Sequence, residues 1–140
     1  MIARNELAYG NWVIDGFGIY KRITSAINDD VYLELKGYDG DSWAENYKNI
    51  QPIPITEELL LEIGFKKEQD KTFSGDYDYT MCIGECFIRI NIYSNTINRD
   101  WNIHIDNNVH DTIFSADIQY VHQLQNAIYF ATDKEINIKL

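Results

Sequence analysis

Residues 87–93, Phe-Ile-Arg-Ile-Asn-Ile-Tyr, alternate strictly between isoleucine and other side chains. Successive side chains of a β-strand point to opposite faces of a sheet, so the three isoleucines lie on one face. Residues 101–105, Trp-Asn-Ile-His-Ile, repeat the alternation after the turn residues 94–96. These two stretches predict an antiparallel sheet with one buried face and one solvated face.

Two other stretches have helical spacing. The first begins at Thr56, which is a suitable N-cap followed by two glutamates, and ends at Gly64, which suits the left-handed residue after a helix. The second runs over residues 118–131, with Ser115 or Asp117 as its cap and Asp133 near its end. Residues 66–80 have the polar composition of a loop, and residues 135–140 alternate like a closing strand.

The first third of the chain predicts several short strands separated by turns, at residues 11–15, 19–23 and 31–35. This order resembles SH3-like barrels in outline. We therefore predict an α+β fold, in which an N-terminal barrel-type small sheet leads through a short helix to an antiparallel sheet packed by a C-terminal helix. The proline-bearing connector suggests a division into residues 1–55 and 56–140, either as two subdomains or around one shared core.

Composition limits the classes of function. The chain has 140 residues and a net charge of −10, which argues against broad binding to nucleic acid or to anionic membranes. No stretch approaches the roughly 18 apolar residues that a membrane-spanning helix needs, and the first residues have no apolar signal core. We expect a cytoplasmic protein with free thiols and no cofactor.

Two groups of residues are candidates for thiol, metal-binding or acid–base chemistry. Cys82 and Cys86 are separated by three residues rather than two, lie in a strand-like stretch, and are expected to be core residues. The second group is a weak metal or acid–base candidate with an ordinary turn as the alternative, and its members are His104, Asp106, His110 and Asp111.

Two further groups are candidates for binding. His122, Gln123 and Asn126 have the spacing of one polar helix face, for which a solvated surface is the simpler interpretation. The aromatic residues of the N-terminal half suit a ligand or peptide platform, with core filling as the alternative; we single out Trp12, Tyr38 and Trp43.

Three segments of the chain resemble a group of small proteins, without an assigned activity, that gut bacteria and their phages or integrated elements encode. The segments are residues 5–13 (NELAYGNWV), 50–60 (IQPIPITEELL) with Gly64 and Phe65, and 120–126 (YVHQLQN) with Tyr129 and Phe130. The resemblance implies a bacterial cytoplasm and a mobile-element setting. It also favours a role for His122, Gln123 and Asn126 beyond facing water.

No catalytic constellation stands out in the sequence. The leading hypothesis is therefore a non-enzymatic binding or accessory module with a protein partner. The first alternative is a metal-dependent hydrolase built on residues 104–111. The second is an acidic mimic of nucleic acid, motivated by the net charge of −10.

Overall fold

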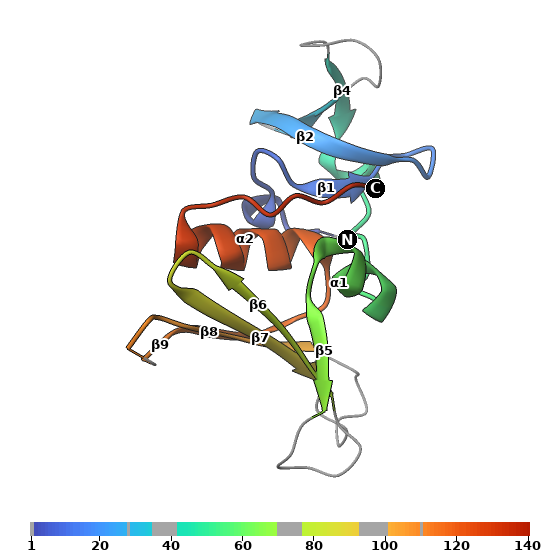
Figure 1. Ribbon diagram of the computed structural model, residues 1–140. Coiled ribbons are helices and arrows are strands. Elements are labelled where there is room, and N and C mark those ends of the chain that lie inside the picture. Colours follow the sequence, from blue (N-terminus) through green and yellow to red (C-terminus); the bar gives the residue numbers. More distant parts are fainter. Residues whose placement is uncertain (1, 28, 35–41, 70–76, 93–100, 110) are drawn as a thin grey trace. The chain divides into compact units, whose positions relative to one another are not determined.

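The computed structural model (Figure 1) describes residues 2–27, 29–34, 42–69, 77–92, 101–109 and 111–140. The chain forms two compact units. The first unit comprises Met1–Pro54, Tyr120–Asn126 and Leu140, and the second comprises Ile55–Gln119 and Ala127–Lys139. The division into separate subdomains near residue 55 stays a prediction. Residues 120–126 group with the N-terminal part of the chain.

The first unit contains an open antiparallel sheet with the strand order β1-β2-β3-β4. Its strands are β1 (Trp12–Ile14), β2 (Tyr20–Ile27), β3 (Asp30–Glu34) and β4 (Ser42–Asn46), and two short 3-10 helices, η1 (Arg4–Glu6) and η2 (Tyr47–Asn49), flank it. Among the described residues β1 does not pair with β4, so the sheet is not closed and the predicted SH3-like barrel is not confirmed.

Alternation along β3 builds the core of the first unit. Val31 and Leu33 are buried while their neighbours in the strand are more exposed, as the sequence pattern predicts. The buried cluster consists of Ile2, Val13, Ile23, Val31, Leu33 and Ile50, with Leu7, Trp43 and Tyr47 packed against it. Trp43 is therefore partly a core residue.

Helix α1 (Glu57–Ile63) begins and ends as the sequence predicts. The Thr56 hydroxyl accepts a hydrogen bond from the backbone N–H of Leu59 at 3.2 Å. Gly64 has φ 114°, a left-handed conformation that favours glycine because it has no Cβ. The helix has only seven residues, so burial of Leu60 and Phe65 must supply much of its stability.

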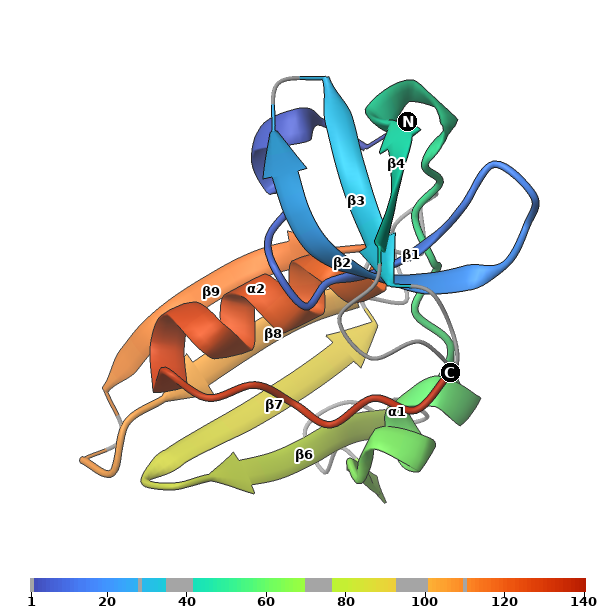
Figure 2. The same ribbon diagram turned by 90° about the horizontal axis from the view of Figure 1, so that it is seen from above.

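The second unit contains a five-stranded antiparallel sheet with the order β5-β6-β7-β8-β9, and Figure 2 shows β6, β7, β8 and β9 side by side. Its strands are β5 (Lys66–Gln69), β6 (Tyr77–Ile83), β7 (Cys86–Ile92), β8 (Trp101–Asp106) and β9 (Thr112–Ile118). Ile88, Ile90, Ile103 and Ile105 are completely buried, which confirms the buried face predicted from their alternation. The α+β class with two antiparallel sheets and two helices is confirmed.

The prediction of a loop over residues 66–80 is wrong for its two ends, which form β5 and the start of β6. All four residues of β5 are exposed, so they carry no apolar alternation that could reveal a strand in the sequence. Residues 70–76, within the predicted loop, lie outside the described residues.

Helix α2 (Val121–Thr132) starts later than predicted, because Ser115 and Asp117 belong to β9 and do not cap it. The side-chain oxygen of Gln123 accepts from the backbone N–H of Tyr120 at 3.2 Å, as the third helical residue does in a capping box. The N–H of Val121 donates to the Ile53 carbonyl at 2.9 Å. This bond satisfies an N–H group of the first turn that has no partner within the helix.

The end of α2 agrees with the prediction, but the segment after it does not. The helix stops at Thr132, and Asp133 has a positive φ of 55°. Residues 135–140 do not form the predicted strand, although Ile138 is buried. An alternating pattern indicates which side chains are buried, but a strand also needs a neighbouring strand to pair with. Here the backbone has no such partner among the described residues.

The Thr56 cap makes α1 testable. We expect Thr56→Ala to lower the free energy of unfolding by about 1 kcal/mol, because the Leu59 N–H loses its acceptor. Urea unfolding followed by circular dichroism measures the change. Thr56→Ser keeps the hydroxyl and is the control; equal losses for the two variants would contradict a capping role.

Candidate functional site

The turn between β1 and β2 is held in one conformation by a buried carboxylate. Asp15 is only 1% exposed, and its Oδ1 accepts from the backbone N–H groups of Phe17 and Ile19, both at 2.9 Å. The backbone adds a bond from Asp15 N to Ile19 O at 2.9 Å and one from Gly18 N to Asp15 O at 3.0 Å. Gly18 has φ 82°, so the turn requires a residue without a Cβ penalty.

This turn presents apolar side chains to solvent. Phe17 is 75% exposed, Ile19 54% and Tyr20 49%. The Phe17 ring lies 5.5 Å from the Trp43 ring, measured between centroids and tilted by 44°. We call Phe17, Ile19, Tyr20 and Trp43 the hairpin surface.

The hairpin surface includes one of the three aromatic residues predicted to bind. Trp43 belongs to it and Trp12 does not. The backbone N–H of Trp12 donates a hydrogen bond to Gln125 Oε1 at 2.9 Å. Tyr38 lies outside the described residues. Phe17 was missed, although an aromatic residue between two turn glycines has little chance of burial and could have been found from the sequence.

Asn126, one of the predicted binding residues, connects α2 to the N-terminal segment within the first unit. Its Nδ2 donates to the Glu6 carbonyl at 2.7 Å, and its Oδ1 accepts from Asn11 Nδ2 at 2.9 Å. Asn11 is buried, and its own Oδ1 accepts from the Ala8 N–H at 2.8 Å. Gln125 adds a bond from its Nε2 to the Gly10 carbonyl at 3.0 Å.

His122 is completely buried, with 0% exposure, so the interpretation of a solvated helix face does not hold for it. Its Nε2 lies 3.1 Å from Glu6 Oε2, and its ring stacks on that of Tyr120 at 5.9 Å. A carboxylate can only accept, so this contact assigns the proton of the neutral ring to Nε2. His122 Nδ1 is buried and has no hydrogen-bond partner among the described residues.

Burial lowers the pKa of His122 below its ordinary value of 6.5, although the Glu6 carboxylate acts in the opposite direction. Gln123 Nε2 also points to Glu6 Oε2, at 3.5 Å. The structure therefore brings His122, Gln123 and Asn126 together with Glu6 and Asn11. Their recorded contacts are internal to the first unit, and a binding role for them stays a prediction.

The weak metal candidates are distributed over β8 and the turn that follows it. Asp106 Oδ1 accepts from the Thr112 hydroxyl at 2.9 Å, and the Asp111 N–H donates to Asn107 Oδ1 at 3.0 Å, as in an ordinary turn. His104 pairs with Arg89 and Ser115 across the sheet. His110 lies outside the described residues, and within those described no group of three His, Cys, Asp or Glu residues could hold a metal ion.

The two cysteines occupy opposite faces of the second sheet. Cys86 precedes the buried Ile88 by two residues, so the two side chains lie on the same face. The Sγ atom of Cys86 lies 3.9 Å from the carbonyl oxygen of Ala131. Cys82 is exposed and lies across from Phe87, whose side chain is also exposed, so the expectation of a core residue is wrong for Cys82, which lies on the solvated face of the sheet. Both thiols are free.

A charged contact joins α1 to the second sheet. Glu57 accepts from Lys67 Nζ at 2.7 Å and from the Tyr79 hydroxyl at 2.6 Å. The bond from Lys67, and then the bond from Tyr79, lower the pKa of Glu57. Burial and the Glu57 carboxylate raise the pKa of Tyr79, so the phenol stays protonated and acts as a donor.

No protein-family model matches the chain, and neither a search of curated proteins nor one of solved structures finds a match. None of the helices in the described part of the chain is long and apolar enough to cross a membrane.

The Asn126 contacts predict a large effect of a small substitution. We expect Asn126→Ala to lower the free energy of unfolding by about 1–3 kcal/mol, because buried Asn11 loses the acceptor of its Nδ2. Urea unfolding of Asn108→Ala, which removes an exposed amide, provides the matched control and should change by less than about 0.5 kcal/mol. A loss no larger for Asn126→Ala than for the control would refute this structural role.

Burial of His122 predicts a pH dependence of stability. Its pKa is lower in the folded than in the unfolded chain, so the unfolded chain binds more protons as the pH falls below 6.5. The free energy of unfolding should therefore decrease between about pH 7.5 and 5.5. We expect this decrease to shrink in His122→Gln and to persist in His104→Gln, each measured by urea unfolding across that range. An imidazole of His122 that titrates above 6.5 by NMR would contradict the expectation.

Proposed function

We propose that the protein is a non-enzymatic binding module that contacts a protein partner through the hairpin surface. The observation that carries this proposal is the exposure of Phe17 on a turn that Asp15 holds by two side-chain hydrogen bonds. Following the resemblance described above, we place the module in the cytoplasm of a bacterium, in a system derived from a phage or integrated element.

The energetics of association favour such a turn. Binding costs conformational entropy for each loop and side chain that becomes ordered, and a turn already held by hydrogen bonds loses less. Phe17 and Trp43 supply large apolar area with few rotatable bonds, which is the composition of residues that dominate protein interfaces. Ile19 and Tyr20 extend the apolar area along the same hairpin.

Affinity capture from a gut-bacterial lysate, followed by mass spectrometry, tests the proposal. We expect a protein recovered in stoichiometric amount with the wild type to decrease about tenfold or more with Phe17→Ser, since a central aromatic contact contributes about 2 kcal/mol or more. Val109→Ser is the matched control, because Val109 is 64% exposed but belongs to the second unit.

Two outcomes would count against the proposal. Recovery of the same proteins by the wild type and Phe17→Ser would show that the hairpin surface is not the contact. Stoichiometric metal in the purified protein, without a partner, would favour the alternative of a metal-dependent hydrolase. Phe17 is exposed, so its replacement should change the free energy of unfolding by less than about 1 kcal/mol.

A further inference from the structure

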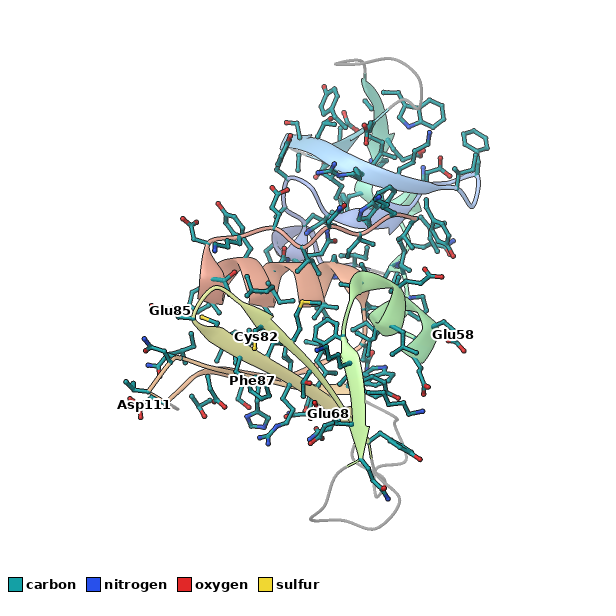
Figure 3. All side chains as sticks on the ribbon, viewed as in Figure 1. Glu58, Glu68, Cys82, Glu85, Phe87 and Asp111 are labelled. Carbon is teal, nitrogen blue, oxygen red and sulfur yellow. The ribbon has the colours of Figure 1, made fainter. Side chains whose placement is uncertain are left out.

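The second sheet ends on one side in β9, a strand of seven residues that pairs only with β8 within the described part of the chain. One row of backbone N–H and C=O groups of an edge strand faces outward, where a further strand can pair with it. Figure 3 labels Glu68 on the opposite edge strand, β5, and Asp111 at the turn before β9.

The two edges of this sheet differ in how they are protected. β5 has four residues, Lys-Lys-Glu-Gln, which are all exposed. Short, charged strands of this kind resist pairing with other chains. β9 reads Thr-Ile-Phe-Ser-Ala-Asp-Ile and contains no lysine, arginine or proline. Its length and composition therefore leave it open to a further strand.

One face of β9 is apolar where it meets the second half of α2. Phe114 is paired with the completely buried Ile105, so its side chain lies on the buried face of the sheet. Its ring lies 5.8 Å from that of Phe130, which is 75% exposed. A strand added beside β9 would place alternate side chains next to these two rings.

The other face of β9 has a carboxylate near each end of the strand, and between them Ser115 lies opposite His104, which pairs in turn with Arg89. Asp117 is paired with Asn102, and Asp106 on β8 accepts from the Thr112 hydroxyl. Asp111 stands at the start of the strand and is exposed. The second unit as a whole has 14 acidic and 7 basic residues in the sequence, so a basic partner is favoured over an acidic one.

We propose that the β9 edge binds an extended segment of another protein in which apolar and basic side chains alternate. The backbone of the segment extends the sheet by one strand. Its apolar side chains contact Phe114 and Phe130, and its basic side chains lie near Asp106 and Asp117. A second copy of this chain is a poorer occupant, because pairing two β9 edges brings together acidic residues of two molecules that each carry a net charge of −10.

This site is independent of the proposed function, because it lies in the second unit and uses no residue of the hairpin surface. The test uses the full chain and a short synthetic peptide of repeated Lys-Val pairs, with blocked ends. NMR of isotope-labelled protein should show shifts of the β9 amides on titration. A peptide methylated on the backbone nitrogens of one edge should bind at least about tenfold more weakly, because it cannot complete the ladder.

Two single substitutions locate the site. Ser115 is exposed on the face of β9 that carries Asp117, and we expect Ser115→Lys to weaken binding of the Lys-Val peptide by about tenfold. Gln69→Lys places the same charge on the β5 edge and is the matched control, which should leave the affinity unchanged. Phe17→Ser should also leave it unchanged, so failure of the hairpin proposal and failure of this one can be told apart.

Several results would overturn the inference. Equal affinity for the methylated peptide would exclude strand addition, and equal affinity for a Glu-Val peptide would exclude a basic partner. Shifts confined to β5 or to the hairpin surface would place the peptide elsewhere. Self-association that Ser115→Lys abolishes in sedimentation would identify a second copy as the occupant. The peptide comparisons use the wild-type protein, so they decide the matter even if a variant does not fold.

Discussion

The side-chain amide of Asn126 forms hydrogen bonds with two polar groups of the N-terminal segment, one of which belongs to the buried Asn11. It donates to the Glu6 carbonyl and accepts from Asn11, which is buried and more than one hundred residues away in the sequence. An unpaired buried polar group costs free energy, so these hydrogen bonds favour the observed placement of residues 120–126 against the N-terminal segment. Gln125 extends the same constraint to the N–H of Trp12, the first residue of β1. The position of β1, and with it the turn that carries Phe17, follows from this amide network.

The two proposed contact surfaces share a physical principle, although they belong to different units. In each, hydrogen bonds order a segment of the chain, and apolar side chains on or beside that segment stay exposed. Asp15 orders the turn that exposes Phe17, and the ladder with β8 orders the β9 strand next to Phe130. Preorganised apolar groups of this kind lose little entropy on association, which is why we interpret both as surfaces for proteins.

Sequence reasoning worked best where one face of an element is buried and the other is not. Alternation identified β7 and β8, and Thr56 and Gly64 marked both ends of α1. It failed where a strand has no buried face, as in β5. It also failed where alternation occurs without a ladder partner, as in residues 135–140. The candidate site was predicted in part, since Trp43 belongs to the hairpin surface but Phe17 was not singled out.

The sequence by itself determined the α+β class, the buried isoleucine face of the second sheet and the caps of α1. These features depend on side chains close together in the chain, whose spacing matches the period of a strand or a helix. Only the tertiary structure decided that His122 is buried against Glu6, that the first sheet stays open, and that β9 forms an edge. Each of these depends on which distant segments meet, and the local periodicity of a sequence carries no information about such pairings.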